Sequence, residues 1–128
     1  MNDFTIMIVD DEEDFRNTLA KRLEKRNLKV LKAGSGEAAL ALIRQTPVDV
    51  VALDVRMQGM DGLEVLQAIK AYDPDIEVVM LTGHASVEAA VQGIELGAFD
   101  YLMKPVGIDD LLFKLQDAHR ARTIRRKR

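Results

Sequence analysis

Apolar residues along the chain form short continuous runs that alternate with longer stretches of helical spacing. Three runs of strand length are almost entirely apolar and rich in β-branched residues, a pattern typical of strands buried on both faces of a parallel sheet. These runs cover residues 5–9, 48–53 and 76–81. Weaker runs at residues 29–33 and 99–103 complete a set of five expected strands, and the run at 29–33 alternates as an edge strand does.

Between the runs, apolar residues recur at spacings of three and four and predict five helices. We expect Ser35 and Ser86 to be the N-caps of the second and fourth helices, and Gly97 to follow the end of the fourth. The apolar stripes are interpreted as faces that pack on the core. In chain order they are Phe15, Leu19 and Leu23; Ala39, Leu42 and Ile43; Leu63, Leu66 and Ile69; Val87, Ala90, Val91 and Ile94; and Leu111, Leu115 and Ala118.

Strand and helix therefore alternate five times, at a spacing of about 25 residues. This order predicts an α/β domain with a doubly wound parallel sheet, helices on both faces and right-handed crossovers. Ligands of such sheets bind beyond the carboxyl ends of the strands. We therefore expect the chemistry of the chain at those strand ends.

Polar side chains follow four of the predicted strands. Asp10 and Asp11 follow the first, Asp54 the third and Thr82 the fourth, while Lys104 follows the fifth. Three crowded carboxylates repel one another unless a cation lies between them. Because no imidazole or thiolate ends a strand, a hard divalent cation is favoured, and Mg2+ fits best because it also accepts phosphate oxygens.

Each of these residues also has a plain structural interpretation. Asp10 and Asp11 could cap the first helix, although Asp54 ends a different strand and cannot serve that helix. A threonine at position 82 could be an N-cap, and Lys104 could be a solvated cation. Tyr101 taken alone would be a core residue, and His84 a surface residue rather than a metal ligand.

Composition narrows the class of protein. The chain has 128 residues, of which 48% are apolar and 30% charged, which suits one domain with a real core. The absence of cysteine excludes disulfides, zinc ribbons and thiol catalysis. No apolar run approaches the roughly 20 residues of a membrane span, so we expect no membrane partner and a cytoplasmic location.

The charge is unevenly distributed. Seven Lys and Arg residues stand against one acid in residues 114–128, while the whole chain carries a net charge of −3. The body is therefore acidic and is not expected to bind nucleic acid directly, because phosphates would repel it. Residues 120–128 are interpreted as a basic C-terminal tail or the start of a solvated linker, with weak binding to nucleic acid or an acidic partner as the alternative.

The ordered motifs resemble the receiver domain of bacterial two-component response regulators, from about residue 4 to about residue 118. The resemblance implies a flavodoxin-like sheet in the strand order 2-1-3-4-5 with five flanking helices, and a receiver domain over residues 1–119. Residues 82–86 are similar to receivers of the nitrogen-regulation type. The motifs are Ile8-Val9-Asp10-Asp11-Glu12, Leu53-Asp54-Val55-Arg56-Met57, Gly59-Met60-Asp61-Gly62, Leu81-Thr82-Gly83-His84-Ala85, Gly97-Ala98-Phe99-Asp100-Tyr101 and Lys104-Pro105.

The resemblance implies a function for each strand end. Asp54 would be the phosphoacceptor for the phosphohistidine of a sensor histidine kinase. Mg2+ would be held by Asp11, Asp54 and the backbone carbonyl of Arg56, and by Asp10 through water. The phosphoryl group would contact Lys104 and Thr82, and also Val55 and Gly83.

Further implications concern the output. Tyr101 would turn inward as Thr82 moves, and the Lys104–Pro105 peptide would be cis. Phosphorylation would alter the face formed by the fourth helix, fifth strand and fifth helix, residues 86–118, to control homodimerisation or an output partner. A fragment of this type would precede an ATPase or DNA-binding output domain. Gln58 departs from the family pattern, because many relatives have proline there, and we expect a more mobile loop after Asp54.

Three other functions were weighed against this signalling switch. A phosphatase with an aspartyl nucleophile would need a second acid where Arg56 stands. A flavodoxin-like cofactor binder would need a phosphate loop after the first strand, and the acidic strand ends would repel a flavin phosphate. An inactive receiver used for docking would not need the complete set of acids and lysine. We expect a phosphoacceptor domain that turns over no external substrate, rather than an enzyme.

Overall fold

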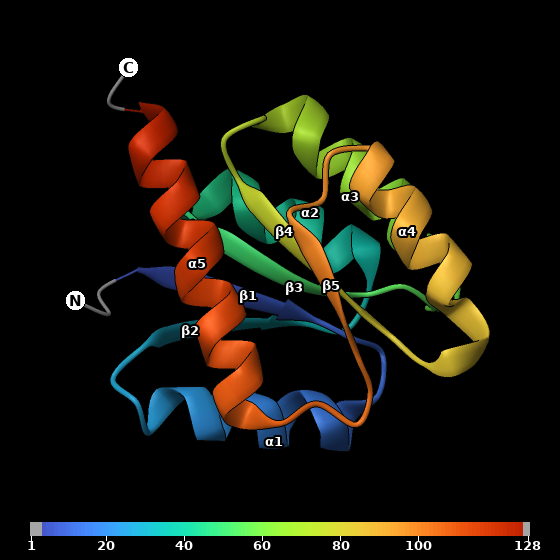
Figure 1. Ribbon diagram of the computed structural model, residues 1–128, viewed down its shortest axis with the longest axis horizontal. Coiled ribbons are helices and arrows are strands. Elements are labelled where there is room, and N and C mark those ends of the chain that lie inside the picture. Colours follow the sequence, from blue (N-terminus) through green and yellow to red (C-terminus); the bar gives the residue numbers. More distant parts are fainter. Residues whose placement is uncertain (1–3, 127–128) are drawn as a thin grey trace.

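The computed structural model describes residues 4–126, which form one sheet of five parallel strands flanked by helices (Figure 1). The order across the sheet is β2-β1-β3-β4-β5, as expected. Every residue of β3 and β4 is buried, whereas β5 is half-buried throughout, because the most continuous apolar runs occupy the centre of the sheet. The strands are β1 (Thr5–Val9), β2 (Lys29–Ala33), β3 (Val50–Asp54), β4 (Glu77–Thr82) and β5 (Asp100–Met103).

Helices cover both faces of the sheet (Figure 1). The buried residues of α1 and α5 join one apolar cluster, and those of α2, α3 and α4 join the other. This arrangement confirms the predicted flavodoxin-like, doubly wound α/β fold. The helices are α1 (Glu13–Glu24), α2 (Gly36–Gln45), α3 (Gly62–Tyr72), α4 (Val87–Glu95) and α5 (Ile108–Arg126), with a short 3-10 helix η1 (His84–Ser86) before α4.

The ends of two helices test the predicted caps. Ser35 is the N-cap of α2, and its hydroxyl accepts the backbone N–H of Ala38 at 3.1 Å. Gly97 follows α4 with a φ of 113°, a conformation that glycine adopts without strain. Ser86 is the N-cap residue of α4, as predicted, but its side chain makes no cap hydrogen bond. Its hydroxyl instead accepts a hydrogen bond from Arg56.

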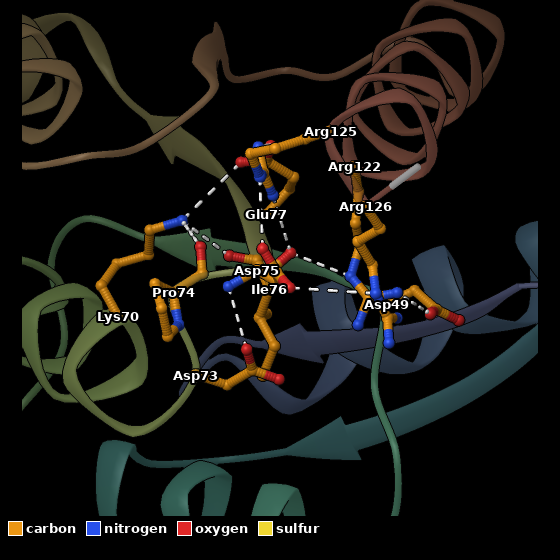
Figure 2. A network of polar contacts seen from close by, with 10 residues as sticks. All are labelled: Asp49, Lys70, Asp73, Pro74, Asp75, Ile76, Glu77, Arg122, Arg125 and Arg126. Atoms are coloured by element: carbon orange, nitrogen blue, oxygen red, sulfur yellow. Dashed lines mark hydrogen bonds and ion pairs between the residues drawn. The ribbon is translucent and has the colours of Figure 1, made fainter. Parts of the chain in front are cut away.

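Helix α5 continues well past Ala118, the last residue of its apolar stripe. Figure 2 shows the arginines of its last turns beside Asp49, Asp75 and Glu77. Arg122 is 9% exposed and donates to the side chain of Asp49 and to the backbone carbonyl of Asp75, at 2.8 and 2.9 Å. Residues 120–126 are thus helical and are tied to the body rather than extended as a solvated linker. Residues 127–128 lie outside the described residues, and the domain boundary after residue 119 stays a prediction.

The register of the sheet brings the strand ends together. Val9 pairs with Leu53, and Asp54 pairs with Leu81, so the residues that follow β1, β3 and β4 meet at one edge. Within residues 4–126, no helix combines the length and the apolarity that crossing a membrane requires.

Candidate functional site at the carboxyl ends of the strands

Three carboxylates meet where β1 and β3 end. Oxygen atoms of Asp10, Asp11 and Asp54 lie within 4.8 Å of one another. Asp10 is fully buried and Asp54 is 6% exposed, whereas Asp11 lies at the surface. Asp10 also accepts the backbone N–H of Glu12 at 2.9 Å, so this carboxylate fixes the turn into α1 and faces the cluster as well.

Lys104 supplies the nearest positive charge. Its backbone N–H donates to the carbonyl of Thr82 at 2.7 Å, which fixes the start of the loop after β5. The ammonium lies 2.9 Å from Asp10, 3.4 Å from Asp54 and 3.7 Å from the exposed Glu12. The peptide between Lys104 and Pro105 is cis, as the family resemblance implied. One ammonium therefore contacts the two buried carboxylates of the cluster and the exposed carboxylate of Glu12.

Burial and the neighbouring charges together set the pKa values of the pocket. Burial, followed by the charge of Asp10, raises the pKa of Asp54 from 3.8 to about 6, although Lys104 and the backbone of Arg56 act in the opposite direction. Burial alone would lower the pKa of Lys104, but its hydrogen bond to Asp10 and the charge of Asp54 outweigh burial and raise it. The pocket therefore lacks positive charge.

A cavity of about 320 Å³ opens beside Asp54, and Thr82, Gly83 and Lys104 line it. The hydroxyl of Thr82 is buried and donates to the carbonyl of Gly83 at 2.9 Å. A Cβ placed on Gly83 would meet no atom within 4 Å, so open space lies beside its backbone. The N–H of Val55 already donates to the carbonyl of Leu81 at 3.0 Å. A phosphoryl oxygen at Val55 would have to share that bond.

The remaining predicted residues lie around this cavity or close to it. Tyr101 is half-buried against the apolar cluster on the α2-α3-α4 face. His84 is exposed, in agreement with its interpretation as a surface residue. Arg56 lines the cavity, and its Nε donates to the buried hydroxyl of Ser86 at 2.6 Å.

Two contacts at the site escape sequence reasoning. The Arg56–Ser86 bond joins the loop after β3 to η1. The sequence pattern does not pair the two residues, because Ser86 alone is interpreted as a helix cap and Arg56 alone as a loop residue. The ring of Phe15, which the periodicity assigns to the core, lies 4.4 Å from the ammonium of Lys104. No local pattern connects positions so far apart in the sequence.

The donor set of the cluster fits a hard cation. All three carboxylates offer oxygen, and Mg2+ prefers oxygen ligands and few of them from the protein. A divalent cation would also add positive charge beside Asp54, whose pKa is raised by burial and by the charge of Asp10. Asp10, Asp11 and Asp54 are the residues that could hold it.

Comparison with known proteins agrees with this geometry. The family model described as "Response regulator receiver domain" matches residues 6–116. A putative response regulator, NtrX-like, of Rickettsia typhi is 37% identical over 99% of this chain and 27% of its own length. The transcriptional regulatory protein ZraR of Escherichia coli K12 is 41% identical over 88% of this chain and 26% of its own length. The chain thus spans about a quarter of these curated relatives.

Solved structures give the same result. NtrX from Brucella abortus, in a crystal structure with ADP, superposes with a TM-score of 0.93 at 35% identity, covering 97% of this chain and 29% of that one. A response regulator receiver domain protein from Clostridium thermocellum gives a TM-score of 0.91 at 31% identity, covering 94% and 98% of the two chains. Receiver domains are the phosphorylation-controlled signalling domains of two-component systems. The chain belongs to the response regulator receiver domain family, and its NtrX relatives confirm the nitrogen-regulation type.

Proposed function

We propose that Asp54 accepts a phosphoryl group from a sensor histidine kinase in a Mg2+-dependent reaction, and that the aspartyl phosphate switches the output surface. The observation that carries the proposal is the position of Asp54. It is a buried carboxylate at the end of a central strand, beside a cavity and within 3.4 Å of a lysine ammonium.

The chemical step is a displacement at phosphorus. A carboxylate oxygen of Asp54 forms a bond to phosphorus as the bond from phosphorus to the histidine nitrogen breaks, and that nitrogen keeps the electron pair. Phosphoryl transfer of this kind depends on position and on neutralising the charge of the phosphoryl oxygens. When bound, Mg2+ supplies part of that neutralisation. Lys104 supplies the rest as a point charge that is already in place.

The same side chains explain how the signal leaves the site. Among residues 4–126, the hydroxyl of Thr82 bonds only to the neighbouring carbonyl of Gly83. It can exchange this local contact for a phosphoryl oxygen, which the backbone of Gly83 and Val55 would also bind. Movement of Thr82 frees space into which Tyr101 turns. The half-buried ring of Tyr101 then repacks against the α4 side of the sheet.

The surface that would be altered is α4-β5-α5, residues 86–118. It exposes large apolar side chains, among them Val91, Ile94 and Phe113 at 44%, 39% and 63%. We propose that phosphorylation promotes homodimerisation or partner binding there. In a longer protein the domain would control an ATPase or DNA-binding output domain, with no direct contact between this domain and nucleic acid. A cytoplasmic location fits such a role.

Intact mass spectrometry tests the chemistry directly. The chain is incubated with a small acyl phosphate and Mg2+, beside Asp54→Asn and the exposed control Asp14→Asn. We expect a gain of one phosphoryl group in the parent and in the control, and none in Asp54→Asn or after Mg2+ is chelated. Equal labelling of Asp54→Asn, or no labelling and no beryllofluoride complex in the parent, would contradict the proposal. Light scattering before and after phosphorylation then tests the dimer.

A further inference from the structure

The lysine of the site has an aromatic neighbour in addition to the carboxylates. The ammonium of Lys104 lies over the ring of Phe15, 4.4 Å from the ring centroid. A cation at this distance from an aromatic face is attracted to the negative charge of the ring. The ammonium is thus held between the carboxylates of Asp10 and Asp54 and one aromatic face.

Phe15 is fixed in this position by the first turn of α1. The guanidinium of its neighbour Arg16 donates to the backbone carbonyl of Asp10 at 2.8 Å, and the backbone N–H of Arg16 donates to the carbonyl of Glu12 at 3.0 Å. The turn that carries Phe15 is therefore bound to the same residue, Asp10, that holds the ammonium. Ring and carboxylate keep their relative positions through this shared attachment.

The burial of the α1 stripe indicates that Phe15 does more than fill the core. Leu19 and Leu23, one and two turns further along, are 4% and 0% exposed, whereas Phe15 is only half-buried. Phe15 instead lines an apolar cavity of about 430 Å³ together with Pro105 and Lys104. Lys104 lines both this cavity and the acidic cavity at Asp54.

Such a contact matters for a flexible side chain. A lysine carries its charge on a four-carbon stem with many rotamers, and here the exposed Glu12 lies 3.7 Å from the ammonium on the solvent side. We infer that Phe15 is a positioning residue for phosphoryl transfer, whose ring face holds the Lys104 ammonium within reach of Asp54 rather than letting it move outward toward Glu12. The inference rests on the proposed function of Asp54 and assigns Phe15 no contact with the phosphoryl group.

The test separates the π face of the ring from its volume. Phe15→Leu keeps an apolar side chain but removes the ring face, Phe15→Tyr keeps the face, and a trifluorinated phenylalanine at position 15 keeps the shape while weakening the ring's attraction for a cation. Phe4→Leu is the matched control. It removes a buried ring from the same apolar cluster, at the start of the chain, where the ring stacks on His119 instead of on a lysine.

The rate of labelling by acyl phosphate is measured for each folded variant. We expect it to fall about three- to ten-fold in Phe15→Leu and by a smaller factor with the fluorinated ring. Phe15→Tyr and Phe4→Leu should label at nearly the parent rate. Parent-like labelling of Phe15→Leu, or an equal loss in Phe4→Leu, would overturn the inference.

A second readout does not depend on phosphorylation. The ring current of Phe15 should shift the proton resonances of the Lys104 Cε upfield, and Phe15→Leu should abolish that shift while Phe4→Leu preserves it. If the parent takes no phosphoryl group, the proposed function fails, and the chemical shifts still decide whether the ring holds the lysine. Unshifted Lys104 resonances in the parent would overturn the inference on their own.

Discussion

Three carboxylates lie close together at the edge of the sheet where the strands begin, and three more at the edge where the strands end. The two groups differ in their ion-pair partners. At the edge where β3 and β4 begin, Asp49, Asp75 and Glu77 face the arginines at the end of α5 and Lys70 (Figure 2). At the edge where the strands end, the carboxylates that follow β1 and β3 share a single lysine. At the first edge the positively charged side chains are at least as numerous as the carboxylates, whereas at the second edge they are fewer.

Where carboxylates and cations are matched, the ion pairs hold the end of α5 against the sheet. Arg125 donates to the buried Glu77 at 2.7 Å, and this hydrogen bond raises the pKa of Arg125. Asp49 accepts from Arg122 and also from the backbone N–H of Thr5 at 2.8 Å, so it links the start of β1 to the last turns of α5. Buried charges of this kind are held in place by partners on several sides.

Where the carboxylates outnumber the cations, they can still bind a further cation. With one lysine for the cluster, Asp54 keeps a raised pKa, and its charged form is stabilised by any further cation that enters. The comparison teaches that a group of carboxylates indicates a functional site only where their charge is not already balanced.

The largest effect is expected at the matched edge. Arg122→Met removes the partner of Asp49 and should lower the free energy of unfolding by about 2–4 kcal/mol, because a half-buried carboxylate loses its charge partner. Urea denaturation measures this loss. Labelling of Asp54 in the folded variant should stay at the parent rate.

Arg120→Met is the control for that variant. Its guanidinium pairs with Asp117 on the exposed side of the same helix, and exposed pairs of this kind contribute about 0–1 kcal/mol. Equal losses in the two variants would mean that the network in Figure 2 contributes no more than a surface pair.

The next effect belongs to the unmatched edge and depends on pH. Asp54 has a pKa of about 6 in the folded chain, above the ordinary 3.8 of an unfolded one. Between these values the folded state binds more protons than the unfolded state. The contribution of Asp54 to the free energy of unfolding is therefore fully present below about pH 4 and is lost as the pH rises through about 6. Two pKa units correspond to about 3 kcal/mol.

Comparison with Asp54→Asn isolates this contribution. Without Mg2+, the stability difference between the parent and Asp54→Asn should change by about 2–3 kcal/mol from pH 4 to pH 7.5, in favour of the variant at the higher pH. Asp14→Asn should follow the parent. A stability difference between the parent and Asp54→Asn that does not change with pH would show that the pKa of Asp54 is not raised in the folded chain.

A smaller effect comes from restoring the balance with a cation. At about ten times its Kd, Mg2+ should stabilise the folded chain by about 1.4 kcal/mol. Thermal unfolding at pH 8 and at pH 5 measures the effect, which should be smaller at pH 5, where protons compete for Asp54. Stabilisation that is equal at both pH values, or undiminished in Asp54→Asn, would place the ion elsewhere.

The parts of the fold and of the site that could be predicted are those set by local sequence patterns. The apolar runs of β3 and β4 are local, and a parallel sheet requires their ends to meet, so the grouping of Asp10, Asp54 and Lys104 could be predicted before the structure was known. The family resemblance added the role of each residue, which composition and spacing alone leave open.

The contacts that escaped prediction join residues distant in sequence. Arg122 and Asp49 are 73 positions apart, and Arg125 and Glu77 are 48 apart. The last turns of α5 have no apolar stripe of their own, because ion pairs rather than burial of apolar side chains attach them to the body. Ser86 is the N-cap residue of α4 as predicted, but its hydroxyl makes no cap bond because it accepts from Arg56 in another loop.

The smallest effect is expected in the loop after Asp54. The backbone N–H of Gln58 donates to the carboxylate of Asp11 at 3.1 Å, so Gln58→Pro removes this hydrogen bond, because proline has no backbone N–H. Proline also restricts the unfolded chain, which gains about 0.4–1 kcal/mol where the backbone conformation allows it. The exposed bond to Asp11 is worth a similar amount in the opposite direction. The free energy of unfolding should therefore change by no more than about 0.5 kcal/mol.

Amide hydrogen exchange is the sharper measurement for this variant. Exchange at Gly59 and Met60 should slow in Gln58→Pro, because the ring fixes one backbone angle of the loop whereas glutamine leaves it free. Asp11 loses its backbone donor without any change in the charge of the cluster, so labelling of Asp54 should persist. Equal exchange in the two proteins would show that the bond from Gln58 to Asp11 restrains the loop as well as a proline does. In that case the glutamine at this position would be a different means of reaching the same rigidity, because its backbone N–H attaches the loop to Asp11 through a hydrogen bond that proline cannot donate.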